Sequence, residues 1–577
     1  MTSITEARRP PEMQVVKSRL VAGQLARIEA RRVALHPATL FGLALSIWAM
    51  WGLNAGEAPV LNRAGTNLAL PQVLLAGGAL IAASNAAVRM WNTERSEAID
   101  ITPASQRTRT LALLAGCSAA SAVGLAVQLL VLGWMMLNDP VTAVNWWEVL
   151  AGPATVGFAV SAGVAAGRWI PSRASGPLAL ITLIGASVYL QMVDTIQQFG
   201  EQVRWLSPIV PLEYEPVELS FRAPGAHLVY LLGLALFFAS LALLKGKHRR
   251  TSFPIIGLVI SIVAVVFGGA LQAQTHDRFD YEARLQALLP PDAEYVCAQN
   301  GRGTYCAYSG YEGWIEEWAA LVEPVLDLAP DEVSSRGLTV KQYPARALDL
   351  LMNGSDVEID YEPGLATGMW WGRQVGDDGG TWGDAYPFGM ALAAAAWAVG
   401  LPVEPVAGIW ELQDDASESF IPGTEGHSPD EISYSACDTW NQGRAVVALW
   451  MASQSSPVTE QHLVNQIQHP RNPLIETIED SQTDGTFTVY NFWDTIGVGQ
   501  PYPWYALEFH KREAYYAYQL LDQPHSEVAE AIHDNWNVLT DPETTTVEAL
   551  AILGVSPLAD YEKNHDESMF DWQPACS

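Results

Sequence analysis

A short charged segment between two apolar runs holds the residues of this 577-residue chain that are best suited to chemistry. Its candidate residues are Glu94, Glu97, Asp100, Pro103, Arg107 and Arg109. The three acids recur every three residues, which places them on one face of a short helix that the proline would end. The two arginines precede the second apolar run. Such a segment can form ion pairs with a soluble partner, although an ordinary charged loop has the same composition.

Motifs for covalent, metal or nucleotide chemistry are missing from the sequence. There is no H-E-x-x-H helix, no G-x-S-x-G turn and no G-x-x-x-x-G-K-[ST] loop. His462 and His469 would need a third ligand to hold a metal ion, and surface histidines are the commoner case. Asp377 and Asp378 offer oxygen ligands for calcium, but without the recurring spacing of a calcium loop. We therefore predict that the chain is not itself an enzyme and holds no metal or cofactor.

The cysteines suggest disulfides rather than a metal site. Cys297, Cys306, Cys437 and Cys576 all follow the last apolar run. An even number suits two disulfides in an oxidising compartment. Cys297 and Cys306 flank a predicted hairpin turn at Asn300-Gly301, so a local bridge between them is the preferred pairing, with Cys437 bound to Cys576. A zinc site is the alternative, although no C-x-x-C spacing is present.

Seven apolar runs precede these cysteines. Each lacks Asp, Glu, Lys and Arg and is close to the roughly 17 to 25 residues that a helix needs to span a bilayer. Seven in series favour a multi-pass membrane protein over the buried helices of a soluble one. The predicted spans are residues 38–53, 68–88, 110–137, 149–167, 177–193, 227–244 and 253–273.

Lysine and arginine are concentrated in the N-terminal segment and in every second connection between the runs. These connections are residues 89–109, 168–173 and 245–250. Because cytoplasmic loops carry the excess of basic residues, we expect a cytoplasmic N-terminus and an extracellular segment after about residue 273. The expected location is the plasma membrane, with the runs in contact with lipid.

The predicted fold class is an α-helical polytopic membrane domain followed by an α/β extracellular domain. Residues 1–36 would form a cytoplasmic segment with an amphipathic helix along the membrane surface. Residues 37–273 would form the seven-span domain, with the charged segment 92–109 and an outer interfacial loop at 194–226. Residues 274–577 would form the extracellular domain.

Few polar side chains lie within the predicted spans. Asn85, Gln128 and Gln191 are candidates for a translocation path, although hydrogen bonding between helices is the commoner role of such residues. The rest of the spans consist mainly of Ala, Gly, Leu and Val, which give no chemical code for a substrate.

The net charge of −31 is also unevenly distributed. Most of the carboxylates follow the last apolar run, whereas the earlier connections are basic. An acidic exterior argues against nucleic acid as a partner.

Two stretches resemble type-2 ABC exporter permeases, especially an actinobacterial group. The sequence RLVAGQLARIEARRVALHPATLFGLAL is similar to the in-plane elbow helix and first span of that family, and TERSEAIDITPASQRTRTLALLAG is similar to its cytoplasmic coupling segment. The outer loop 194–226 is similar to the re-entrant helices of that fold. The matching coupling positions are Glu94, Glu97, Thr102, Pro103, Arg109, Thr110, Leu111 and Ala112.

The resemblance implies a permease subunit with a six-span core plus a seventh span. Its partners would be a separate ABC ATPase, which binds ATP and Mg²⁺, and a second permease subunit, identical or different. Movement of the ATPase would reach the spans through residues 92–109, and transport would be export. Two alternatives remain: a membrane-anchored extracellular hydrolase, related to the metallopeptidase-like outer domains of some permeases, and a sensor without transport activity.

Overall fold

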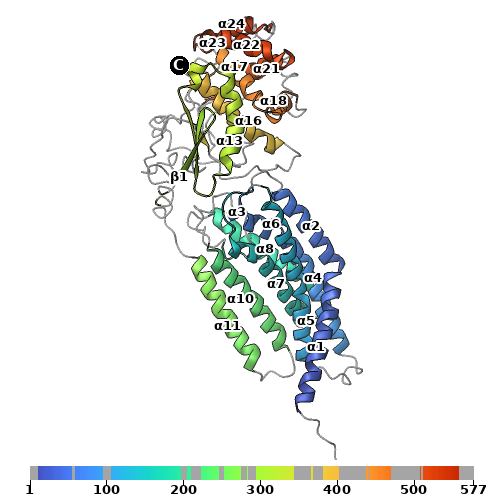
Figure 1. The fold of residues 1–577 in the computed structure, drawn as a ribbon. Helices are drawn as coiled ribbons and strands as arrows, with labels where there is room; N and C mark the ends of the chain where they lie inside the picture. Colours follow the sequence, from blue (N-terminus) through green and yellow to red (C-terminus); the bar gives the residue numbers. More distant parts are fainter. Residues whose placement is uncertain are drawn as a thin grey trace, which may run out of the picture. The chain divides into compact units, whose positions relative to one another are not determined.

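The computed structural model divides into two compact units, one formed mainly by residues up to Asp277 and one mainly by residues from Arg278. We call them the helical unit and the C-terminal unit. Figure 1 shows the helices and strands of both. The structure describes residues 11–54, 59–94, 105–138, 140–196, 205–209, 223–245, 252–273, 283, 287, 294–342, 365–367, 381–401, 437–439, 441–468, 507–508 and 511–557.

The helical unit is a bundle of apolar helices, and each of the seven predicted runs falls mainly within helix. Two of the runs are divided: the chain breaks its helix before Gln72, at Pro71, and again at Ser118. The helices are α1 (Pro11–Ala34), α2 (Pro37–Asn54), α3 (Leu61–Ala69), α4 (Gln72–Glu94), α5 (Gln106–Cys117), α6 (Ala119–Met135), α7 (Trp146–Trp169), α8 (Ser175–Ile196), α10 (Pro224–Leu244) and α11 (Ser252–Gln272).

Five stretches of this unit are long and apolar enough to cross a membrane, and the bent pair α1–α2 raises the number to six. The angle within that pair is 61°. The predicted fifth span coincides with α8, whose described apolar part, Ser175–Gln191, is shorter than a full span. The described residues therefore support a multi-pass membrane protein with five or six candidate spans. The five stretches are Leu61–Met90, Gln106–Met135, Trp146–Trp169, Pro224–Leu244 and Ser252–Gln272.

Helix α4 lies at the centre of the helical unit, in contact with α2, α7 and α8. Glycines allow these backbones to approach closely: a Cβ at Gly78 would collide with the carbonyl of Ala38 on α2. Likewise, a Cβ at Gly163 of α7 would collide with the carbonyl of Leu80 on α4. Small residues at such contacts are typical of membrane helices, which associate through close packing rather than through the hydrophobic effect.

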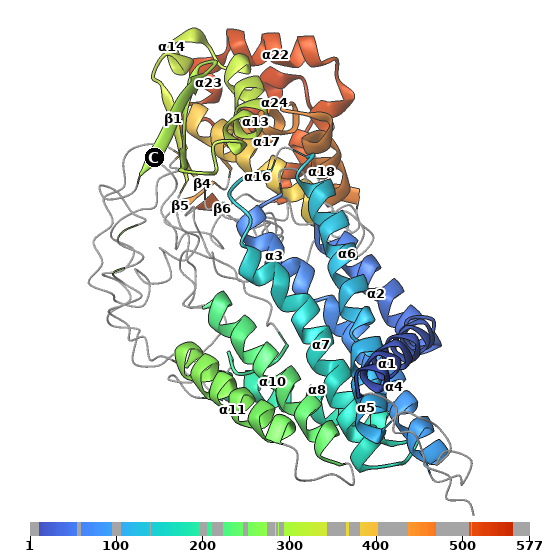
Figure 2. The same cartoon turned by 60° about the horizontal axis from the view of Figure 1, so that its bottom comes forward.

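Helices α10 and α11 form a hairpin, side by side in Figures 1 and 2. Gly268 of α11 lies against the backbone of Ala226 and Tyr230 at the start of α10. Among the described helices, α11 makes extensive contacts with α10 alone. Its outer face is apolar and more than half exposed, as suits contact with lipid; this face comprises Ile256, Val259, Ile260, Val263, Val266 and Phe267.

The C-terminal unit combines small sheets with helices. Strands β1 (Tyr295–Asn300), β2 (Gly303–Tyr308), β3 (Leu338–Gln342) and β4 (Leu365–Thr367) form one sheet in that order, antiparallel between β1 and β2 and parallel elsewhere. Strands β5 (Cys437–Asp438) and β6 (Leu507–Glu508) form a parallel pair. The helices are α13 (Trp314–Leu328), α14 (Asp331–Ser334), α16 (Thr381–Ala398), α17 (Gly443–Ser453), α18 (Pro457–Gln468), α21 (Lys511–Gln519), η4 (Leu520–Asp522), α22 (His525–Asp534), α23 (Trp536–Leu539) and α24 (Thr546–Leu553).

Helix α17 forms the core of this unit. All 11 of its residues are buried, and it contacts α16, α18, α21 and α24. Surrounding helices thus shield every face of α17 from water, which explains why its sequence, GRAVVALWMAS, has no polar stripe.

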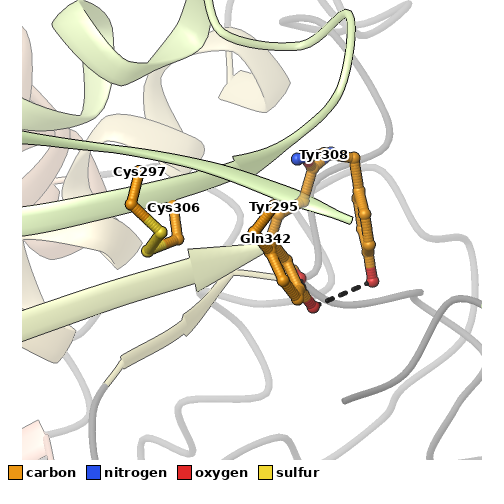
Figure 3. The surroundings of a disulfide bond; sticks show 5 residues. All are labelled: Tyr295, Cys297, Cys306, Tyr308 and Gln342. Atoms are coloured by element: carbon orange, nitrogen blue, oxygen red, sulfur yellow. Dashed lines mark hydrogen bonds between the residues drawn. A yellow bond between two sulfur atoms is a disulfide. The ribbon is translucent and has the colours of Figure 1, made fainter. Parts of the chain in front are cut away.

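The predicted local disulfide is confirmed. Cys297 and Cys306 face each other across the β1–β2 hairpin with their Cα atoms 4.0 Å apart, as Figure 3 shows. Gly301 has a φ of 64° in the turn, a conformation that glycine adopts readily. The carboxylate of Glu323 on α13 accepts the backbone N–H groups of Arg302 (2.7 Å) and Gly303 (2.9 Å), which fixes the turn against that helix.

The second predicted disulfide pair lies largely outside the described residues. The backbone of Cys437 belongs to β5, whereas Cys576 is not among the described residues. The pairing of these two cysteines stays a prediction.

Candidate functional site

One end of the helical unit carries most of its basic side chains, and we call it the basic end. It comprises the C-terminal ends of α1, α4, α7 and α10 and the N-terminal ends of α5 and α11. Contacts bring these ends together: the guanidinium of Arg107 on α5 lies 5.0 Å from the ring centre of Phe253 on α11. The ammonium of Lys245, after α10, lies 4.7 Å from the ring centre of Trp169 on α7. Both are cation–π contacts.

A buried carboxylate binds α1 to this end of the bundle. Glu29 of α1 is 7% exposed. Its Oε2 accepts a hydrogen bond of 2.6 Å from Arg89 on α4, and its Oε1 accepts one of 3.1 Å from Arg32. A buried carboxylate needs such charge-assisted partners, and those here come from two different helices. We call Glu29, Arg32 and Arg89 the Glu29 cluster.

A close crossing of α1 and α5 supports the Glu29 cluster. A Cβ at Gly116 of α5 would lie 2.6 Å from the carbonyl oxygen of Ala26 and 2.9 Å from the backbone nitrogen of Ala30. Helix α1 is therefore fixed both to α4, through an ion pair, and to α5, through backbone contact. These are the two helices that precede and follow the predicted coupling segment.

The structure describes the predicted coupling residues only in part. Glu94 is the last residue of α4, and its side chain is outside the described set, as are Glu97, Asp100 and Pro103. Arg107 and Arg109 lie in the first turn of α5, where the Oγ of the N-cap residue Ser105 accepts the N–H of Thr108. The described candidates thus lie where α4 ends and α5 begins.

The three candidates for a translocation path lie in separate surroundings. Gln128 of α6 is completely buried and lies beside Gly152 and Gln72. Asn85 is half-buried on α4, thirteen residues beyond Gln72 and therefore about 20 Å away along the helix. Gln191 of α8 instead donates a long hydrogen bond of 3.4 Å to Ser207. A translocation path lined by these three residues stays a prediction.

The partner of Gln191 belongs to residues 205–209, within the predicted interfacial loop 194–226, whose first residues instead belong to α8 and whose last residues belong to α10. Ser207 is completely buried. The carbonyl of Leu206 accepts a 2.9 Å hydrogen bond from the hydroxyl of Tyr230 on α10, and that of Pro208 lies 3.5 Å from the Oγ1 of Thr155 on α7. Thr155 is nine residues into α7, about 13 Å from its start. This short segment therefore lies among the helices.

The C-terminal unit contains a buried histidine, the predicted ligand candidate His462. It is 2% exposed, and its ring centre lies 5.2 Å from that of Phe388. Burial lowers the pKa of His462 to about 4, so the ring is neutral at physiological pH. The described residues contain no group of three or more His, Cys, Asp or Glu side chains that could hold a metal ion. His469, Asp377 and Asp378 are outside the described residues.

Buried polar contacts also join the helices around α17. Arg444 donates to Gln442 Oε1 (2.8 Å) and to the carbonyl of Gly400 (2.9 Å). Glu513 of α21 is completely buried and accepts a 2.9 Å hydrogen bond from the hydroxyl of Thr546 on α24. These contacts satisfy buried polar groups within the core, and we assign them to the stability of the unit.

Sequence reasoning did not identify Glu29. A signal was present, because Glu29 is the only carboxylate between Met13 and Gly56 and lies among arginines. Comparisons with models of protein families, with curated proteins and with solved structures found no match for this chain.

Proposed function

We propose that this protein is a permease subunit of an ATP-driven ABC transporter, an exporter, in which the connection between α4 and α5 receives the movement of a separate ATPase. The observation that carries the proposal is the Glu29 cluster. It ties the N-terminal helix to α4 at the point where α4 enters that connection. A helix held in this way would move together with the connection rather than independently of it.

The packing of α4 supports a mechanical role. It is a continuous helix of 23 residues, so its two ends are about 33 Å apart. Its backbone is in direct contact with α2 at Gly78 and with α7 at Gly163. Because closely packed helices shift as discrete bodies rather than deform smoothly, displacement of the end near Glu94 would be passed to α2 and α7.

The orientation follows from charge in this proposal. The basic end would lie on the cytoplasmic side of the cell membrane, with the N-terminus inside the cell. After seven crossings, with α2 and α8 counted as spans, the C-terminal unit would lie outside. The Cys297–Cys306 disulfide is consistent with that oxidising side.

The proposed partners are those of an ABC permease. The sequence has no nucleotide-binding loop, so ATP and Mg²⁺ would bind to a separate ATPase. A second permease subunit, identical or different, would complete the pathway. The C-terminal unit would receive or guard the transported molecule on the outside.

Charge reversal in the connection tests the proposal. We expect Glu94→Lys/Glu97→Lys to abolish co-purification with the ATPase or to uncouple its ATP turnover from transport, because the new charges would repel the surface that the acids recognise. Glu332→Lys/Glu543→Lys is the matched control, since both glutamates are exposed in the C-terminal unit. Normal assembly and turnover in the first variant would overturn the proposal.

A further inference from the structure

Helix α6 presents polar side chains to α4 and α7. Ser121 and Gln128 are seven residues apart and therefore on one face of α6. Gln72, the first residue of α4, reaches the same region, where its Nε2 donates a 2.9 Å hydrogen bond to the carbonyl of Gly124 on α6. We call Ser121, Gln72 and Gln128 the polar line.

Several atoms of the polar line are buried without a hydrogen-bond partner among the described residues. They are the Oγ of Ser121, the Oε1 of Gln72 and both the Nε2 and the Oε1 of Gln128. Gln128 is completely buried. An apolar bundle gains nothing from such groups, since a buried amide without a partner loses the hydrogen bonds that it makes in water.

The neighbouring helices leave room for these side chains. Each member of the polar line faces a glycine: a Cβ at Gly157 would lie 3.2 Å from the Oγ of Ser121, and one at Gly152 would lie 2.7 Å from the Nε2 of Gln128. A Cβ at Gly124 would collide with the Oε1 of Gln72. Larger residues at these three positions would displace the polar atoms. The glycines on α6 and α7 therefore leave space for the polar line.

We propose that the polar line binds small neutral molecules whose hydroxyl groups both donate and accept hydrogen bonds. The unpartnered set contains both donors and acceptors, which a hydroxyl can satisfy together. Ser121 and Gln128 are about 10 Å apart along α6, so a chain of hydroxyls is needed to connect them. Water is one source, and a hydroxyl of a transported molecule is the other.

A double-mutant cycle on the full chain in lipid–detergent micelles tests this inference. We expect Ser121→Ala and Gln128→Met to be non-additive, with a coupling of at least about twofold in the unfolding equilibrium constant, because both side chains would share bound hydroxyls. Methionine keeps the length of glutamine, so the variant should fold. The control cycle uses Ser118→Ala with Gln128→Met; Ser118 is exposed, and its Oγ donates to the carbonyl of Ala115.

Added glycerol distinguishes the two sources. Coupling without glycerol identifies water, whereas coupling that requires glycerol identifies an organic hydroxyl. Additive effects under both conditions, with Gln128→Met as stable as the unmodified chain, would overturn the inference. So would a density map of the full chain that shows a direct Gln72–Gln128 hydrogen bond. Neither measurement needs an ATPase, so the result is independent of the proposed transport function.

Discussion

Two regions, the Glu29 cluster of the helical unit and the surroundings of His462 in the C-terminal unit, hold a buried titratable group in different ways. In the helical unit, Glu29 is buried but has arginine partners from α1 and α4 at 3.1 and 2.6 Å. In the C-terminal unit, His462 is buried against an aromatic ring, and its pKa is lowered to about 4. The Glu29 cluster thus gives a buried carboxylate basic partners, whereas burial of the His462 ring excludes water and disfavours its charged form.

Glu29 therefore connects two helices, whereas His462 fills a core. The Glu29 cluster joins two helices that are far apart in sequence, so its removal should change the movement of α4. His462 instead contributes to packing, and its replacement should change how the stability of the C-terminal unit responds to acid. Four measurements test this difference.

The largest effect is expected from acid on the C-terminal unit. Between pH 6.5 and about 4, the ordinary and lowered pKa values of His462, the unfolded chain binds a proton that the folded unit excludes. This contribution to stability is therefore present above pH 6.5 and is lost as the pH falls toward 4, by on the order of 3 kcal/mol.

Hydrogen exchange of peptides from α17 and α18 across this pH range would measure the loss. We expect a flatter profile in His462→Gln, and an unchanged profile in His533→Gln, because His533 is exposed on α22. Equal profiles for the unmodified chain and His462→Gln would remove the contrast between the two units.

The next effect concerns the disulfide of the C-terminal unit. The bridge closes a short loop, with a sequence separation of 9, and Cys297→Ser/Cys306→Ser should lower the free energy of unfolding by about 2–3 kcal/mol. Denaturant unfolding with and without a reducing agent measures this. The reducing agent should affect the unmodified chain more than the variant, which retains only the predicted Cys437–Cys576 pair, whereas equal sensitivity in both would contradict the assignment.

Removal of Arg89 should have a smaller effect on stability but a specific effect on the attachment of α1 to α4. Arg89→Met leaves the buried carboxylate of Glu29 with one partner, which should cost about 1–3 kcal/mol of unfolding free energy in mixed micelles. Arg27→Met is the control, because Arg27 is an exposed base on α1, the helix that carries Glu29. Equal stability of the two variants would show that the Glu29 cluster does not bind α1 to α4.

The smallest effect is expected at Lys245. Its contact with Trp169 joins the ends of α10 and α7, but Trp169 is 46% exposed. Lys245→Met should therefore lower the unfolding free energy by only about 0.5–1 kcal/mol. A loss larger than that of Arg89→Met, measured in the same micelles, would reverse the proposed ranking of contacts at the basic end.

Local patterns allowed much of the fold to be predicted. The apolar runs became helices, and the Cys297–Cys306 pair formed across its predicted hairpin. Both depend on residues that are close in sequence. The division of one run at Ser118 was not predicted, because composition is continuous across that position.

Contacts between distant segments could not be predicted in the same way. Glu29 and Arg89 are 60 residues apart, and nothing local to either residue identifies the other. Gln128 was identified as polar, but its neighbour Gln72 and the facing Gly152 come from other helices. Only the packing of α4, α6 and α7 brings these residues together, which is why the polar line emerged from the structure.

The position of α11 has a consequence for protein engineering. This helix packs on α10 and makes no other extensive contact among the described helices. The packing of the other helices therefore depends little on α11. A chain that ends after α10 should still assemble its remaining helices, and a different soluble domain could be grafted onto the same bundle. Helix α11 is thus separable from the helices that precede it.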